Sequence, residues 1–176
     1  MIARFVVVAV LSLFAYPRQP VARVLAAAWV AAEVGVELRV SPAILVAVAE
    51  HESDLEPCAV SFRAAGRRVD VVAPRCWVDP RWPRPYVCGY LQAMYGDANT
   101  CGRAMRLDGA MRAGALELLE WAATCRGDAA CVLRGHAGGT ACALDARACT
   151  GPQLAFAQLF AGRAMSLGWR GPTIEE

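Results

Sequence analysis

The sequence contains no lysine. All 18 of its basic residues are arginine, set against 16 acidic residues, so the formal net charge is only +2. Such a balance gives no strongly positive surface of the kind that binds a phosphate backbone, and we therefore expect no nucleic-acid partner. Arginine suits carboxylates and acidic polymers somewhat better than lysine does, because its planar guanidinium can donate two parallel hydrogen bonds.

A metal-binding pattern is also missing. The chain has eight cysteines and two histidines, but no C-x-x-C pair, whereas structural zinc sites usually show closely spaced cysteines, often with histidine. We therefore expect disulfides, no metal and no cofactor. Disulfides form in oxidising compartments, which predicts an exported protein. Cys125 with Cys131 and Cys142 with Cys149 could close local loops, and the remaining pairings stay open. The cysteines are Cys58, Cys76, Cys88, Cys101, Cys125, Cys131, Cys142 and Cys149.

The apolar run near the N-terminus is shorter than the roughly 20 residues that a membrane-spanning helix needs. It follows a short basic start, covers Phe5–Tyr16 as FVVVAVLSLFAY, and is closed by Pro17 and Arg18. This is the form of a secretory signal, although no A-x-A cleavage site follows it. Residues 1–18 are thus predicted to be a signal peptide or a short, weak membrane anchor. A buried first helix is the alternative.

The rest of the chain, residues 19–176, shows neither an internal repeat nor a low-complexity tail. It is long enough for one core. Hydrophobic residues make up 57% of the sequence and alanine leads them, which favours helices. We expect a mainly α domain. Its helices are predicted at 19–36 with Gly35 at the end, from Ser41-Pro42 to 50–54, at 110–124 with Asp108 as N-cap, at 128–133 with Asp128 as cap, and from Thr150 to Gly168.

Two connecting segments look irregular. Residues 57–88 contain five prolines, which exclude a long helix. Such a long loop is either functional or cross-linked, and three cysteines lie within it. A strand or hairpin edge is expected at 69–72, where three valines fall. Residues 135–139 are predicted to form a flexible glycine-rich loop.

The second helix ends with candidate acid catalysts. Its stretch AILVAVAEHE is apolar on nearly every side, as in a buried central helix. A carboxyl group at the end of such a helix loses water, which raises its pKa and lets it donate a proton near neutral pH. Glu50 and Glu52 both share apolar helical stripes, so periodicity does not choose between them. Both could also be solvated residues at a fraying helix end.

Four short motifs occur in an informative order. They are ESDLEP at 52–57, GYLQ at 89–92, AMRAG at 110–114 and HAGG at 136–139. They resemble the E-S-x-[apolar]-x-P, G-[apolar]-[apolar]-Q, N-[apolar]-x-x-G and Y-N-x-G motifs of lytic transglycosylases. That family belongs to the lysozyme-like superfamily together with goose-type lysozymes. The resemblance covers roughly residues 20 to 168 and implies a lysozyme-like helical domain.

The resemblance implies site residues one by one. Glu52 becomes the single catalytic acid and base, Ser53 hydrogen-bonds near it or near the substrate, and Gln92 lines the sugar cleft. Gly139 matches the last motif. His136 stands where the family has a tyrosine that contacts the acid or the substrate, and it would titrate near neutrality. Ala137 replaces an asparagine.

Aromatic residues offer a second kind of sugar contact. Tyr90, Trp77, Trp82 and Tyr86 could stack on sugar rings, or could simply cover the disulfide-linked loop.

The implied substrate is the glycan strand of peptidoglycan, cleaved between N-acetylmuramic acid and N-acetylglucosamine with formation of a 1,6-anhydro end. A goose-type hydrolase is an alternative if Asp54, Asp70, Asp79 or Asp97 positions water. The changes at 136 and 137 instead favour a catalytically inactive peptidoglycan-binding or structural module. A small disulfide scaffold without a sugar function is a third alternative. An exported enzyme of this class would be periplasmic or secreted, of bacterial or phage origin, alone or within a larger envelope or virion assembly.

Overall fold

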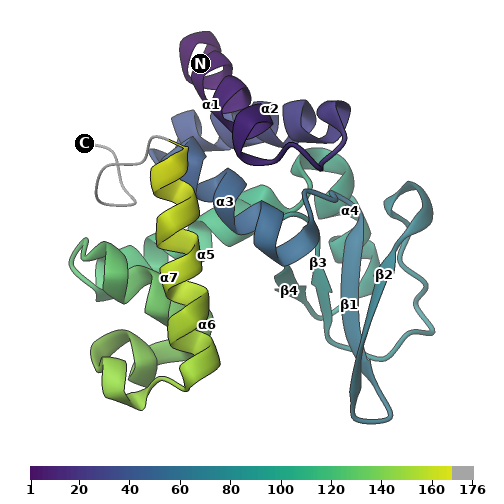
Figure 1. Ribbon diagram of the computed structural model, residues 1–176. Helices are drawn as coiled ribbons and strands as arrows, with labels where there is room; N and C mark the ends of the chain where they lie inside the picture. The colour runs from purple at the N-terminus through teal and green to yellow at the C-terminus, as the bar shows by residue number, and fades with distance from the viewer. Residues whose placement is uncertain (168–176) are drawn as a thin grey trace.

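The computed structural model describes residues 1–167 and is mainly helical, with one small antiparallel sheet set to one side (Figure 1). This confirms the predicted class. The helices are α1 (Ile2–Ala15), α2 (Val21–Leu38), α3 (Pro42–Ser53), α4 (Ala98–Asp108), α5 (Met111–Thr124), α6 (Ala129–Leu144) and α7 (Gly151–Ser166). The strands are β1 (Ala59–Ala64), β2 (Arg67–Val72), β3 (Tyr86–Cys88) and β4 (Ala93–Tyr95), and two short 3-10 turns, η1 (Pro74–Cys76) and η2 (Ala146–Ala148), complete the order.

Helix α3 lies at the centre of the molecule, between the other helices and the sheet (Figure 1). Every residue from Pro42 to Ala49 is buried, as its all-round apolar sequence predicts. Full burial of each large aliphatic side chain, such as Ile44 or Leu45, stabilises the fold by about 1.5–3 kcal/mol. The helix ends where Asp54 adopts the left-handed conformation and its N–H bonds back to Ala49 and Glu50.

The segment 57–88, predicted to be irregular, instead forms most of the sheet. Its strand order is β2-β1-β3-β4, and each neighbouring pair is antiparallel. The hairpin edge expected at 69–72 is confirmed, since β2 pairs along its whole length with β1. The prolines lie between the strands rather than within them. They made the segment look irregular in the sequence, but they do not interrupt the hydrogen bonds between strands.

Four disulfides pair all eight cysteines. Cys125–Cys131 and Cys142–Cys149 close the predicted local loops among the helices. The other two link the region of the sheet, as Cys58–Cys76 and Cys88–Cys101. Disulfide formation is thus confirmed over a zinc site, and it indicates an exported protein.

Three predicted helix boundaries are wrong. Gly35 lies within α2, which continues to Leu38. A Cβ at this position would approach the carbonyl oxygen of Val40 to 2.6 Å, so close packing rather than helix termination explains the glycine. Asp108 closes α4 instead of capping α5, since Gly109 turns the chain with a left-handed conformation. Residues 135–139 continue α6 rather than forming a loop, and only Gly139 departs from helical geometry (φ 74°, ψ −169°).

The predicted caps fare differently. Asp128 accepts a hydrogen bond from the N–H of Cys131, and Thr150 forms a reciprocal capping box with Gln153. Ser41 occupies the N-cap position of α3 without a side-chain cap bond. The predicted last helix begins as expected, while its end at Gly168 lies outside the described residues.

The N-terminal segment forms α1, which packs along α2 on the side of the molecule away from the sheet (Figure 1). Val8, Ala9 and Ser12 are buried in this contact. The opposite side is apolar and exposed, with Val7 56% and Phe14 82% accessible. Within residues 1–167, no helix combines the length and apolar character needed to cross a membrane.

Candidate active site

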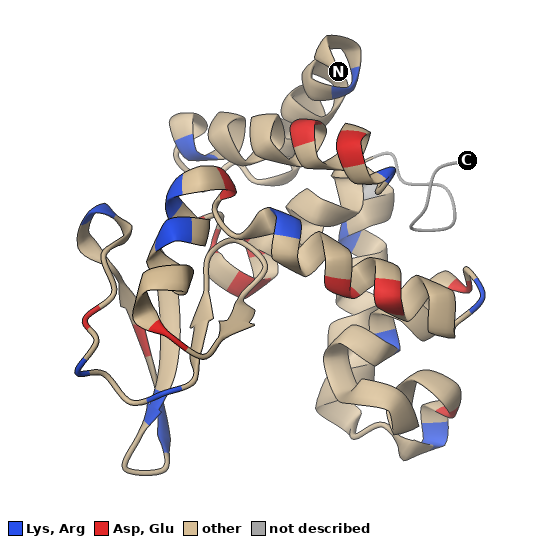
Figure 2. Ribbon diagram, turned by 180° about the vertical axis from the view of Figure 1, so that it is seen from behind, with Lys and Arg blue, Asp and Glu red and all other residues tan. Residues whose placement is uncertain are grey.

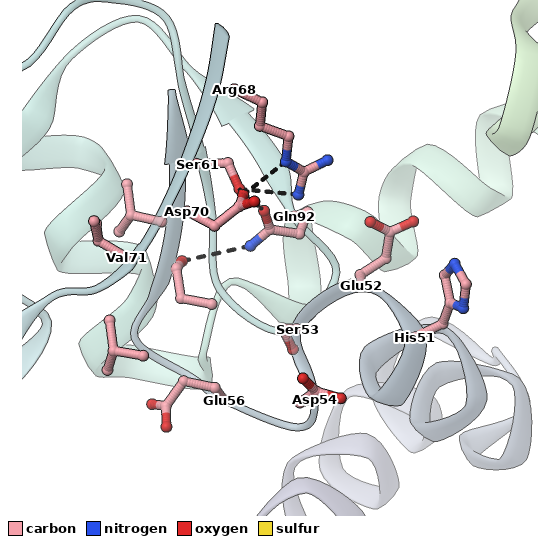
Figure 3. A pocket seen from close by; sticks show the side chains of 13 residues that line it. His51, Glu52, Ser53, Asp54, Glu56, Ser61, Arg68, Asp70, Val71 and Gln92 are labelled. Atoms are coloured by element: carbon pink, nitrogen blue, oxygen red, sulfur yellow. Dashed lines mark hydrogen bonds and ion pairs between the residues drawn. The ribbon is translucent and has the colours of Figure 1, made fainter. Parts of the chain in front are cut away.

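A cavity of about 330 Å³ opens between the end of α3 and the sheet. Glu52 stands on its helical side, while polar residues of the sheet gather across from it (Figure 3). The cavity therefore faces a helix end that carries a carboxylate with a strand surface that carries hydrogen-bonding groups. Its lining comprises His51, Glu52, Ser53, Asp54, Glu56, Ala59, Val60, Ser61, Arg68, Asp70, Val71, Val72 and Gln92.

The two glutamates of α3, which periodicity does not distinguish and of which the motif resemblance implies Glu52, have separate environments. Glu50 forms an ion pair with Arg163 of α7, and its side chain is 13% exposed. Glu52 lines the cavity with its side chain 17% exposed. Glu50 thus faces Arg163 beside a separate cavity near Ala15 to Gln19, while Glu52 lines the cavity that faces the sheet.

Gln92 is held rigidly on the sheet side. It occupies a left-handed position after β3 (φ 50°), and its Nε2 donates to the carbonyl of Gly89 at 3.1 Å. Its Oε1 lies 2.7 Å from Ser61 Oγ. The Nε2 hydrogen bond to Gly89 holds the amide beside Ser61, whose single hydroxyl hydrogen serves either Gln92 Oε1 or Asp70 Oδ1.

Asp70 belongs to the same network. Its Oδ1 lies 2.5 Å from Ser61 Oγ and 2.6 Å from Arg68 Nε, and Arg68 Nη2 donates to Ser61 Oγ at 3.0 Å (Figure 3). The Ser61 hydrogen bond, with help from Arg68, holds the pKa of the Asp70 carboxyl below its usual value. Asp70 is therefore an ionised group in the cavity at neutral pH.

Behind Glu52, His136 of α6 lies between two carboxylates. Its Nε2 is 3.7 Å from Glu52 Oε1 and its Nδ1 is 3.3 Å from Glu117 Oε1 on α5. Burial disfavours the charged imidazolium, but the Glu117 contact and the negative charges of Glu117 and Glu52 outweigh it and raise the pKa of His136 to about 9. The expected contact with Glu52 is present, whereas the expected titration near neutrality is not.

Ser53 lines the cavity beside Glu52, whereas Tyr90 and Gly139 do not line it. Ser53 Oγ bonds to the carbonyls of Ala49 and Tyr90, and so ties the end of α3 to the loop before β4. The Tyr90 side chain is 2% exposed and packs against Gly109, which removes it from the cavity. Gly139 breaks α6 one turn after His136 and does not line the cavity.

Most of the other aromatic candidates pack on a second, smaller hydrophobic core that lies under the sheet and α4. Tyr86 is fully buried, and Trp82 stacks on Phe62 with ring centroids 5.1 Å apart. Trp77 is 57% exposed on η1 but does not line the cavity. These positions support the covering interpretation rather than sugar stacking.

Three polar residues of the site were not singled out by sequence reasoning: Ser61, Arg68 and Glu117. Asp70 was named there as one of four aspartates that could position water. No motif marks them. The only available signal was the two-residue spacing of Arg68 and Asp70 on the predicted strand, which places both on one face.

The comparisons add no relative. The chain matches no protein-family profile, no curated protein and no solved structure. Within residues 1–167, no group of three histidine, cysteine or acidic side chains lies close enough to hold a metal ion.

Proposed function

We propose that this protein is an exported enzyme that cuts the glycan strands of peptidoglycan, as a lytic transglycosylase with Glu52 as its acid and base. The observation that carries the proposal is the accessible Glu52 at the end of a buried helix, facing a polar sheet across a cavity. Periplasmic or secreted localisation follows from the substrate and agrees with the four disulfides.

In this mechanism Glu52 gives its proton to the glycosidic oxygen between N-acetylmuramic acid and N-acetylglucosamine. The bond to C1 of the muramic residue breaks with help from the substrate's own N-acetyl group. The resulting carboxylate of Glu52 then takes the proton of the muramic O6 as O6 bonds to C1. No water is consumed and no second catalytic carboxylate is needed.

The sheet side supplies substrate positioning. Gln92 lines the cavity and is held by Gly89 and Ser61, so contact with a ligand would need little further ordering of its side chain. Asp70 and Arg68 compensate each other's charge and hold Ser61. They act through Ser61 on Gln92 in this proposal and touch no reacting atom.

A hydrolase is the second candidate, and Asp70 is the observation that favours it. Only Oδ1 of Asp70 is engaged by Ser61 and by the Arg68 Nε hydrogen bond. Its ionised carboxylate lines the same cavity as Glu52 and could orient water or stabilise positive charge on the sugar. The products of the two reactions differ by one water molecule.

Mass spectrometry of the soluble products from digested sacculi decides between these reactions. Wild type, Glu52→Gln and an untreated sample are compared with all four disulfides intact. Anhydro-muropeptides from wild type alone support the transglycosylase. Products with reducing ends that are absent from the Glu52→Gln sample indicate the hydrolase. If wild type with all four disulfides intact releases no products, both reactions are contradicted and a binding module remains.

A further inference from the structure

Three ionisable groups from three helices form a chain behind the cavity. Glu52 comes from α3, Glu117 from α5 and His136 from α6, and the imidazole lies between the two carboxylates. The side chains become more exposed away from the centre, with 7% accessible surface for His136, 17% for Glu52 and 43% for Glu117. Glu52, at one end of this row of side chains, thus reaches the cavity, and Glu117, at the other end, reaches solvent.

The two contacts of His136 use different ring nitrogens. Nδ1 faces Glu117 and Nε2 faces Glu52. A carboxylate that accepts the Nδ1–H fixes both the tautomer and the ring orientation, which leaves Nε2 directed at its other partner. Phe156 and Phe160 of α7 lie beside the imidazole, with ring centroids 6.2 and 5.9 Å away, and limit its movement.

We propose that Glu117 and His136 are positioning residues for Glu52: Glu117 fixes the imidazole, and His136 Nε2, an ion-pair partner 3.7 Å from Glu52 Oε1, orients the Glu52 carboxyl group and passes it a proton when the two groups close to hydrogen-bond distance. This inference rests on the proposed function. Neither residue touches the substrate, and both act through Glu52.

Glu52, His136 and Glu117 together carry the same number of protons before and after one reaction. When the proton lies on Nε2, His136 is an imidazolium between two carboxylates. When it moves to Glu52 Oε1, Glu52 becomes the neutral acid and His136 a neutral imidazole that still donates Nδ1–H to Glu117. After Glu52 protonates the glycosidic oxygen, it recovers one proton from the muramic O6. The three side chains therefore return to their initial protonation state.

The other ionisable groups of the helices packed around His136 have partners of their own. On α3, Glu50 is paired with Arg163 of α7, and His51 packs edge-on against Phe156 and Phe160, the rings that also contact His136. On α7 the groups facing the imidazole are the rings of Phe156 and Phe160. On α5, Glu117 also accepts a hydrogen bond from Trp121, and the His136 hydrogen bond is the main cause that lowers the pKa of Glu117. Glu52 and Glu117 are therefore the groups that govern the titration of His136.

The coupling can be measured without any catalysis. The chain has two histidines, so His136→Gln assigns the imidazole signals in a ¹⁵N NMR titration. In wild type the His136 midpoint should lie well above that of an ordinary histidine. It should fall in Glu117→Gln and also in Glu52→Gln, while Glu120→Gln, an exposed glutamate one turn further along α5, should leave it unchanged. An ordinary midpoint in wild type, or no fall in Glu117→Gln, would overturn the proposal.

A kinetic measurement then tests positioning itself. Glu117→Gln should lower kcat roughly 10-fold, the lower end expected when an outer partner of a functional group is lost, with KM unchanged and the alkaline limb of the pH profile moved toward neutrality. In a His136→Gln background it should add nothing. Equal additive losses in both backgrounds, or a change in KM alone, would contradict a role through Glu52. If wild type releases no products, the proposed function fails, yet the NMR titration still decides the coupling.

Discussion

The helices and the sheet that face each other across the cavity are stabilised differently. Among the described residues, the helical core joins 32 buried residues, whereas the core under the sheet and α4 joins ten. The disulfides compensate for this difference. Those of the helical part close loops of 6 and 7 residues, while Cys58–Cys76 and Cys88–Cys101 close loops of 18 and 13.

This contrast assigns distinct tasks to the two parts. The large core holds α3 and fixes the position of Glu52, which suits a group that must transfer a proton with good geometry. The sheet carries Ser61, Asp70 and Gln92 on a smaller scaffold that depends on covalent links. Basic residues lie near the free end of the β1–β2 hairpin (Figure 2), namely the exposed Arg63, Arg67 and Arg68. Arg63 and Arg67 thus give the end of this hairpin exposed positive charge, while Arg68 is paired with Asp70.

The largest expected effect concerns the two glutamates of α3. Glu52→Gln should lower the rate of glycan cleavage by roughly 10²–10⁴-fold, because it removes the proton donor. Glu50→Gln is the matched control in the same helix. It breaks the pair with Arg163 and should lower the thermal midpoint while it leaves most of the activity. Similar rate losses for both variants at a temperature where both are folded would contradict the assignment.

Removal of one disulfide from each part sharpens the comparison. By the chain-entropy relation, the double variant Cys58→Ser/Cys76→Ser should lose about 3 kcal/mol of unfolding free energy, against about 2 kcal/mol for Cys125→Ser/Cys131→Ser. Because the sheet core is small, the first variant should also lose hydrogen-exchange protection in β1 and β2. Urea denaturation and amide exchange measure the two effects. Loss of sheet protection in the second variant instead would refute the division.

The pH dependence of stability tests the buried imidazole. The pKa of His136 is raised to about 9 in the folded state, so its protonation stabilises the fold fully below the unfolded value near 6.5, and this contribution disappears as pH rises through about 9. The difference corresponds to about 3 kcal/mol. Unfolding free energy measured from pH 6 to 10 should therefore decline in wild type. His136→Gln should show a flatter curve, and an equally steep decline there would contradict the account.

The smallest effect is expected on the sheet. Asp70→Asn weakens the hold on Ser61 and Gln92 and should reduce kcat roughly 10-fold, equivalent to about 1.4 kcal/mol, with the same anhydro products. Measured product ratios and rates test this. A loss as large as that of Glu52→Gln would instead favour Asp70 as a second catalytic carboxylate and a hydrolytic reaction.

The same contrast explains what the sequence could predict. Helix α3 and its terminal glutamates could be predicted because a continuous apolar stretch follows the helix-starting pair Ser41-Pro42, and Pro57 excludes a longer helix. The caps at Asp128 and Thr150 were readable because a short polar side chain before a helix has a local partner. These features depend on neighbours along the chain.

The unpredicted features depend on partners far along the chain. The sheet pairs β1 with both β2 and β3 and was hidden by short strands and prolines. Periodicity did not separate Glu50 from Glu52, and the ion-pair partner of Glu50, Arg163, lies more than a hundred residues away. Glu117 lay on a correctly predicted helix, but a glutamate on a helix is usually solvated, and only the fold brings it to His136.

The most direct test of the account is where a glycan binds. An NMR titration of Glu52→Gln with a purified peptidoglycan tetrasaccharide can follow two side-chain amides, the one introduced by the substitution and that of Gln92, which stand on opposite sides of the cavity. We predict that both amides shift together, along with the backbone of Ser61 and Asp70. Shifts confined to one side of the cavity, or found only on α1 and α2, would contradict a glycan site between the helices and the sheet.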